Sequence, residues 1–107
     1  MNTQRIEKVI RNMHAHGLNQ LIVTSPANVY YLTGVWCEPL ERMLALHVKG
    51  DGEMTLYANR MFALQGLTDV PMIEYEDTDD SIAVLAPGLL PGRVGMGVLS
   101  RVGWALI

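Results

Sequence analysis

The chain has 107 residues, of which 50% are hydrophobic and 18% are charged, and its formal net charge is −3. This composition predicts one folded domain with its own core and excludes a disordered chain. The eight basic residues are scattered rather than clustered, so nucleic acid is not an expected partner. No apolar stretch approaches the roughly 20 residues of a membrane-spanning helix, so a membrane is not expected either.

Residues 3–16 predict an amphipathic helix, because four apolar side chains recur at helical spacing on one face. These side chains are Ile6, Val9, Ile10 and Met13. Gly17 is placed to end this helix, and the apolar run at residues 18–24 predicts a short strand after it. His14 and His16 lie two residues apart in the last helical turn, so they point in different directions and are poorly placed to bind one metal.

Residues 25–34 predict a loop followed by one helical turn. Ser25 can cap the helix, Pro26 suits its first position, and Gly34 can adopt the left-handed conformation that ends it. The intervening sequence is Asn28-Val29-Tyr30-Tyr31-Leu32-Thr33. Together with the strand before it, this segment predicts a compact strand–loop–helix unit.

A central hairpin is predicted next. Residues 41–49 predict an inner strand, because residues 43–46 are apolar on both faces. The sequence Gly50-Asp51-Gly52 favours the positive φ angles of a tight turn. Apolar side chains alternate in the strand that follows, at residues 53–58. One side carries Met54, Leu56 and Ala58, and the other carries Thr55 and Tyr57.

The remaining residues predict short helices that alternate with strands. The expected elements are a helix at residues 60–64, a strand at 71–75, a helix at 81–86 and a strand at 93–98. Asn59 and residues 78–80 are suited to cap the two helices, and Pro71 places its strand near an edge of the sheet. Helices and strands that alternate around one hairpin predict an α/β domain with a mixed sheet.

The single cysteine, Cys37, cannot form an internal disulfide, which fits a reducing compartment. The first five residues lead directly into the helix without the apolar region of a signal peptide. We therefore expect a cytoplasmic protein in which Cys37 is a small, half-buried hydrophobic residue rather than a nucleophile.

The sequence contains none of the usual signatures of a serine hydrolase, a zinc peptidase, a redox dithiol or a phosphate-binding loop. Acidic residues gather at positions 74–80, where carboxylates could attract a hard cation. A solvated loop is the favoured interpretation, because some of these residues serve as helix-start residues.

Two residues in and just beyond the loop after Gly34, Trp36 and Arg42, are the candidate functional residues. Aromatic and guanidinium side chains at a loop are common anchors at interfaces and for carboxylates. The alternative is structural: Trp36 covers the end of the sheet, and Arg42 begins a strand that faces water.

These elements together resemble the N-terminal domain of the creatinase/prolidase/aminopeptidase P family, and the resemblance covers essentially the whole chain. The features that carry it are the first helix with Arg5, the strand at residues 21–24, the signature Asn28-x-x-Tyr31-Leu32-Thr33-Gly34 and the hairpin with Gly50-Asp51-Gly52-Glu53. The resemblance implies a single three-layer α/β domain, with a mixed sheet flanked by helices in a ribonuclease H-like motif.

The resemblance also implies a parent protein. In that family the full-length protein is typically a homodimeric metallopeptidase that removes residues next to proline or acts on related small amidino substrates. Two divalent metals, commonly manganese or cobalt, are held in its C-terminal domain. The N-terminal domain resembles a lid and dimerisation element at the mouth of the neighbouring active site. By this analogy Arg42 contacts a substrate carboxylate across the dimer, and Trp36 lines the entrance.

Residues 102–107 stay mostly apolar up to the last residue, which predicts a piece of a longer protein. We expect residues 1–107 to be the non-catalytic N-terminal domain of an Xaa-Pro dipeptidase-like metallohydrolase that cleaves small proline-containing peptides. Without the C-terminal domain, this piece should hold no catalytic residue and no metal, and should be inactive as an enzyme. The alternative is a stand-alone peptide-binding module that uses the surface around Trp36 and Arg42.

Overall fold

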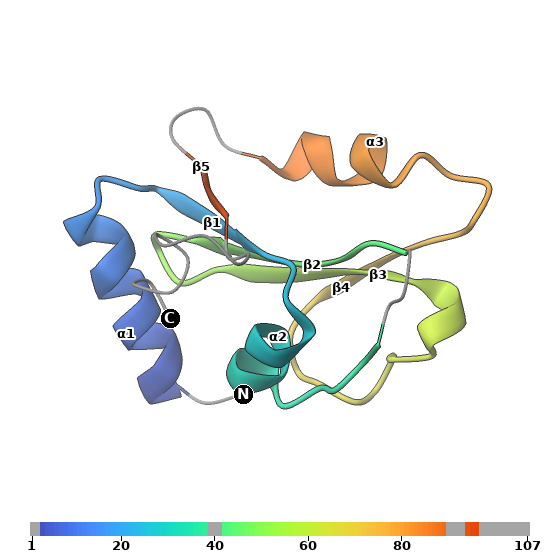
Figure 1. The fold of residues 1–107 in the computed structure, drawn as a ribbon, viewed down its shortest axis with the longest axis horizontal. Helices are drawn as coiled ribbons and strands as arrows, with labels where there is room; N and C mark the ends of the chain where they lie inside the picture. The colour runs from blue at the N-terminus through green and yellow to red at the C-terminus, as the bar shows by residue number, and fades with distance from the viewer. Residues whose placement is uncertain (1–2, 39–41, 90–93, 97–107) are drawn as a thin grey trace.

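The structure is a computed structural model that describes residues 3–38, 42–89 and 94–96 (Figure 1). The helices are α1 (Thr3–Ala15), α2 (Pro26–Thr33) and α3 (Ser81–Leu85), with short 3-10 helices η1 (Arg60–Phe62) and η2 (Ala86–Gly88). The strands are β1 (Gln20–Val23), β2 (Leu44–Lys49), β3 (Met54–Asn59), β4 (Met72–Tyr75) and β5 (Val94–Met96). The predicted order of elements is confirmed across these residues.

The five strands form one sheet in the order β4-β3-β2-β1-β5. Strand β2 pairs antiparallel with β1 and β3, whereas β4 runs parallel to β3 and β5 runs parallel to β1. Four strands therefore run in one direction and β2 runs against them. As a result, the carboxyl ends of those four strands and the amino end of β2 lie at the same edge of the sheet.

Helices cover both faces of the sheet, with α1 and α2 on one face and α3 on the other (Figure 1). The predicted three-layer α/β domain with a mixed sheet is therefore confirmed. The predicted position of the strand with Pro71 is also confirmed, because β4 is an edge strand.

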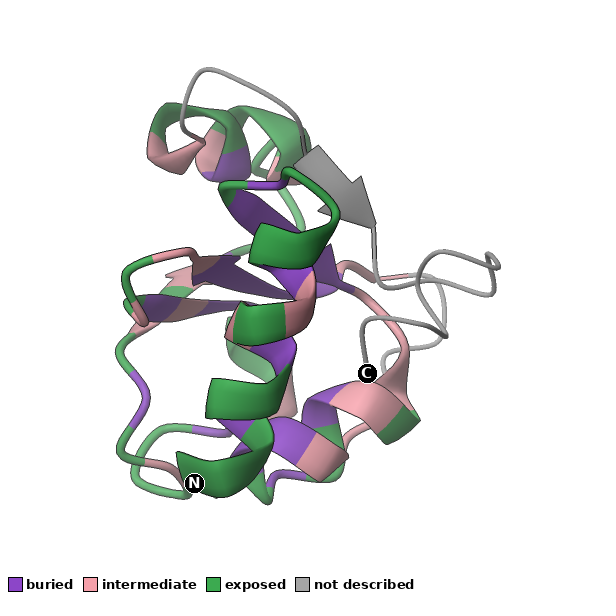
Figure 2. Ribbon diagram, turned by 90° about the vertical axis from the view of Figure 1, so that its left-hand side faces the viewer, coloured by how far each residue is buried: buried purple, intermediate pink, exposed green. Residues whose placement is uncertain are grey.

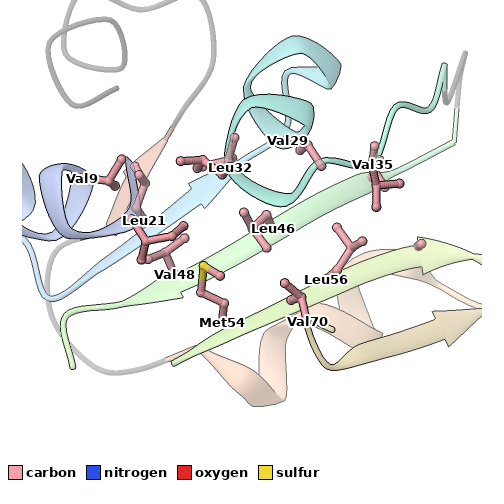
Figure 3. Packing of buried hydrophobic residues seen from close by; sticks show 14 of the residues in the cluster. Val9, Leu21, Val29, Leu32, Val35, Leu46, Val48, Met54, Leu56 and Val70 are labelled. Atoms are coloured by element: carbon pink, nitrogen blue, oxygen red, sulfur yellow. The ribbon is translucent and has the colours of Figure 1, made fainter. Parts of the chain in front are cut away.

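The larger core lies between the sheet and the helices α1 and α2. Helix α1 buries Ile6, Val9 and Met13 toward the sheet, and Figure 2 shows that its outer side is exposed. In Figure 3, Val9 of α1 and Leu32 of α2 lie over Leu21 of β1. The alternation predicted for residues 53–58 puts Met54, Leu56 and Ala58 into this core.

A smaller cluster lies on the opposite face, where α3 covers the sheet. Its buried members are Ile22, Ala45, Tyr57 and Leu85. The chain passes close to the sheet at Gly88, where any side chain would overlap the hydroxyl group of Tyr57. A side chain at this position would therefore require the Tyr57 hydroxyl group to shift.

Helix α2 differs from its prediction in two ways. It has eight residues rather than one turn, and Ser25 occupies the N-cap position without making a side-chain cap hydrogen bond. Ser25 is therefore the N-cap residue, as predicted, but its side chain does not supply the hydrogen bond. The prediction for Gly34 is confirmed, because it ends the helix with a φ of 79° and its N–H donates to the Tyr30 carbonyl oxygen.

The predicted helix at residues 60–64 is only the 3-10 helix η1, because Ala63 adopts a positive φ of 52° directly after it. The predicted cap is present, since the Asn59 side chain accepts a hydrogen bond from the Met61 N–H. The apolar end at residues 102–107 lies outside the described residues. In the part of the chain that is described, no helix is both long and apolar enough to span a membrane.

Candidate functional site

An open pocket of about 560 Å³ lies at the sheet edge where the carboxyl ends of the parallel strands meet. Its wall combines the start of α2 with the segment that leads into β2. The lining residues are Thr24, Ser25, Pro26, Ala27, Trp36, Glu38, Arg42, Met43 and Leu44. In open α/β sheets, ligands bind in crevices at this edge, because the loops that follow the strands converge there.

The structure brings the two candidate residues, Trp36 and Arg42, together in the lining of this pocket. The Trp36 side chain is 55% exposed and is packed edge-on against the exposed ring of Tyr30, with the ring centroids 5.9 Å apart. An exposed aromatic pair offers apolar contact area at a low cost in side-chain entropy. Trp36 therefore lies at an accessible position in the pocket lining.

The guanidinium group of Arg42 is held by the carboxylate of Asp77, a partner that the sequence did not predict. Its Nε donates to Oδ1 of Asp77 at 2.8 Å, and its Nη2 donates to Oδ2 of the same residue at 3.0 Å. This paired geometry fixes the orientation of the guanidinium group as well as adding to the interaction energy. Hydrogen bonds from Arg42, and then from Asn59, lower the pKa of Asp77 below its usual value.

Asn59 and Tyr75 make further hydrogen bonds next to the Arg42–Asp77 ion pair. The buried Asn59 donates through Nδ2 to Oδ1 of Asp77 at 2.7 Å, while its own Oδ1 accepts from the Met61 N–H at 2.9 Å. The hydroxyl group of Tyr75 donates to the Met43 carbonyl oxygen at 2.6 Å. Burial is the main reason that the pKa of Tyr75 is raised.

Asn59, Tyr75 and Asp77 also belong to the site, although the sequence patterns did not predict them there. Asp77 is 35 residues from Arg42, and the sequence grouped it with the other acidic residues at positions 74–80. The feature that could have indicated their role is the position of two of them at strand ends. Asn59 ends β3 and Tyr75 ends β4, at the same edge of the sheet as the pocket. Recognising this feature required the strand order, which the sequence alone did not provide.

The acidic residues at positions 74–80 are mostly exposed, yet each of the carboxylates accepts a hydrogen bond. The donor–acceptor pairs are Gln65 to Glu74, Arg60 to Glu76, Arg42 to Asp77, the Glu76 N–H to Asp79, and the Ile82 N–H to Asp80. The interpretation as a solvated loop is therefore incomplete, because these carboxylates also hold neighbouring segments in place. Among residues 3–38, 42–89 and 94–96, no three His, Cys, Asp or Glu side chains are arranged to hold a metal ion.

Cys37 follows Trp36 and is half-buried against the larger core, as the sequence predicted. Burial raises the pKa of its thiol group, and the neighbouring carboxylate of Glu38 raises it further. A thiol with a raised pKa is a poor nucleophile at neutral pH. The pocket lining combines apolar and aromatic side chains with the charged groups of Glu38 and Arg42, which is suited to binding.

Comparison with known proteins gives the family. The pattern of the Creatinase/Prolidase N-terminal domain family matches residues 5–103. An uncharacterized peptidase of Staphylococcus haemolyticus (strain JCSC1435) is 31% identical over 84 residues, which cover 75% of this chain and 24% of that protein. The chain spans about a quarter or less of the length of the curated relatives that it matches.

Solved structures agree with this match. The N-terminal domain of an Xaa-Pro dipeptidase from Lactobacillus brevis has a TM-score of 0.76 and 25% identity, over 95% of this chain and 84% of that chain. A recombinant prolidase from Thermococcus sibiricus has a TM-score of 0.79 and 23% identity, over 99% of this chain and 31% of that chain. Since the family pattern spans nearly the whole sequence and the fold is shared, this chain belongs to the creatinase/prolidase N-terminal domain family.

Proposed function

We propose that this chain is the non-catalytic N-terminal domain of an Xaa-Pro dipeptidase-like hydrolase, in which it contributes dimer contacts and access of the substrate to the active site. The observation that carries this proposal is the joint placement of Trp36 and Arg42 on one open pocket. A pocket wall with an aromatic ring, a proline and a guanidinium group can hold a small peptide by stacking and by hydrogen bonds to its carbonyl groups.

The hydrolytic chemistry is assigned to a C-terminal domain beyond residue 107. The described residues do not fit a metal site, so no step of the reaction is placed on this chain. Two divalent metals, manganese or cobalt, would belong to that later domain, where they would activate a water molecule. A cytoplasmic location is part of the same proposal and rests on the single cysteine, Cys37.

The first test is the gene sequence past residue 107. A downstream segment with spaced Asp, Asp, His, Glu and Glu is expected, whereas a stop codon directly after Ile107 would contradict the proposal. The purified 107-residue chain should not cleave an Xaa-Pro dipeptide at any manganese or cobalt concentration. Metal-dependent hydrolysis by this chain would show that the catalytic assignment is wrong.

The second test uses the protein that the whole gene encodes, which should sediment as a dimer. The Trp36→Ala and Arg42→Ala variants should each raise KM for an Xaa-Pro dipeptide by about tenfold, the equivalent of about 1.4 kcal/mol of binding, with a smaller change in kcat. Met61→Ala is the matched control, because Met61 is exposed and apolar but does not line the pocket. Equal KM values in all three variants would argue against substrate access through this pocket.

A second candidate function, a stand-alone peptide-binding module, is favoured by the exposed pair Tyr30 and Trp36. Aromatic residues on a surface are typical anchors for extended peptides. The gene sequence past residue 107 separates the two candidates, because only the hydrolase needs a second domain.

A further inference from the structure

The pocket wall formed by Arg42 and Met43 is held by residues that lie two strands away. This wall leads directly into β2, whereas Tyr75 ends β4 and Asp77 follows it. Strand β3 lies between β2 and β4 in the sheet. The contacts therefore reach across the end of β3, where Asn59 is placed.

Two consecutive residues of the wall are held by different means. The Arg42 side chain is gripped by both carboxylate oxygens of Asp77, at 2.8 and 3.0 Å. The main chain of Met43 is fixed by the Tyr75 hydroxyl group, at 2.6 Å. Asp77 is fixed in turn by Asn59, which is 1% exposed and bonded at both ends of its amide group.

Stability alone is a weak reason for this arrangement. The side chains of Arg42 and Asp77 are 36% and 51% exposed, and ion pairs at such exposure add little to the free energy of folding because water screens them. A two-point contact does, however, fix the direction of a guanidinium group. The lowered pKa of Asp77 keeps its carboxylate ionised, and so keeps this contact, at neutral and mildly acidic pH.

We propose that Asp77 and Tyr75 are positioning residues of the pocket, which act on a bound peptide only through Arg42 and Met43. Asp77 sets the direction of the Arg42 guanidinium group, and Tyr75 sets the distance of the Met43 main chain from the pocket. This inference rests on the proposed function, because it assigns a role at the same site.

A neighbouring ion pair provides the matched control. Arg60 Nη1 donates to Oε1 of Glu76 at 2.8 Å, and the two side chains are 65% and 55% exposed. Neither residue lines the pocket. Glu76→Gln therefore removes an ion pair from the position next to Asp77 while it leaves the pocket wall in place.

The kinetic test uses the protein that the whole gene encodes, with an Xaa-Pro dipeptide as the probe. Asp77→Asn and Tyr75→Phe should each raise KM several-fold with kcat nearly unchanged, and Glu76→Gln should change neither constant. In the exchanged variant Arg42→Asp/Asp77→Arg the ion pair can re-form, but the guanidinium group is then attached to position 77, after β4, instead of to the pocket wall at position 42. Its KM should stay raised, whereas a purely structural pair predicts that the exchange restores KM.

A second measurement needs no activity and can be made on the 107-residue chain. The Nε–H proton of Arg42 should exchange slowly with water in the NMR spectrum of the unmodified chain and of Glu76→Gln. The same proton should exchange quickly in Asp77→Ala, which removes the oxygen that accepts from Nε–H. Slow exchange in Asp77→Ala would overturn the inference, because the guanidinium group would then be held without the Asp77 carboxylate.

The two proposals can fail separately. If Trp36→Ala and Arg42→Ala leave KM unchanged, the proposed function is wrong. If those two variants raise KM while Asp77→Asn and Tyr75→Phe behave like Glu76→Gln, the pocket is functional and the positioning roles are wrong.

Discussion

A buried histidine on the sheet, His47, shows how a single side chain couples this fold to pH. It is 1% exposed, and its Nε2 lies 2.9 Å from Oε1 of the fully buried Gln20. Because an amide oxygen can only accept, this geometry assigns the ring proton to Nε2. Burial, followed by the nearby charge of Lys49, lowers the pKa of His47 below its ordinary value.

The His47 environment predicts a pH-dependent stability. The unfolded chain takes up a proton near pH 6.5, whereas the folded chain does so only at lower pH. The free energy of unfolding should therefore be constant above about pH 6.5 and should fall below it, by at most about 1.4 kcal/mol per pH unit, until the folded pKa is passed. Urea denaturation between pH 5.5 and 7.5 measures this slope.

His47→Gln should remove this slope, and His16→Gln is the control because His16 is exposed at the end of α1. A slope that persists in His47→Gln and disappears in His16→Gln would contradict the assignment.

The N-terminal ends of helices α2 and α3 are stabilised in different ways. Helix α3 begins after Asp80, whose carboxylate accepts from the Ile82 and Ala83 N–H groups. Helix α2 begins at Pro26, and the Ser25 side chain makes no cap hydrogen bond. Proline needs no N–H partner at the first helical position, which reduces the need for a cap.

This difference predicts unequal effects of two cap mutations. Asp80→Ala should lower the free energy of unfolding by about 1 kcal/mol, because two N–H groups lose their acceptor. Ser25→Ala should change it by less than about 0.5 kcal/mol. Chemical denaturation followed by circular dichroism measures both, and Asp80→Asn should recover most of the loss. A larger effect at Ser25 than at Asp80 would refute this account.

At the scale of the whole molecule, the described residues form two apolar clusters of unequal size on the two faces of one sheet. Leu46 lies fully buried in the larger cluster, beneath α2 (Figure 3). Leu85 joins the smaller cluster from α3, and the neighbouring Ile82 is 64% exposed. Since both clusters share the strands, we expect the domain to unfold in a single transition.

The loss in the free energy of unfolding should be larger for substitutions of more deeply buried residues in the two clusters. Leu46→Ala should cost about 2–5 kcal/mol and Leu85→Ala should cost less, because the smaller cluster can close around the lost volume. Ile82→Ala should stay within about 0.5 kcal/mol of the unmodified chain. Urea denaturation with both circular dichroism and tryptophan fluorescence tests the ranking. Transitions that do not coincide, or a larger cost at Leu85, would contradict the single-domain description.

The sequence by itself determined the order of the elements and the direction of most side chains. The helical spacing of Ile6, Val9 and Met13 and the alternation of residues 53–58 are local patterns, and the structure buries them as predicted. The left-handed end of α2 at Gly34 was also readable, since it depends only on the backbone freedom of one residue.

Only the tertiary structure decided the strand order and the contacts that join distant segments. Arg42 and Asp77 are 35 residues apart, and nothing in the local sequence links them. They meet because β2 and β4 flank β3, and the amino end of β2 lies at the same edge of the sheet as the carboxyl end of β4. Spacing along the chain encodes which face a side chain occupies, whereas the partner that it meets depends on how the strands are ordered in space.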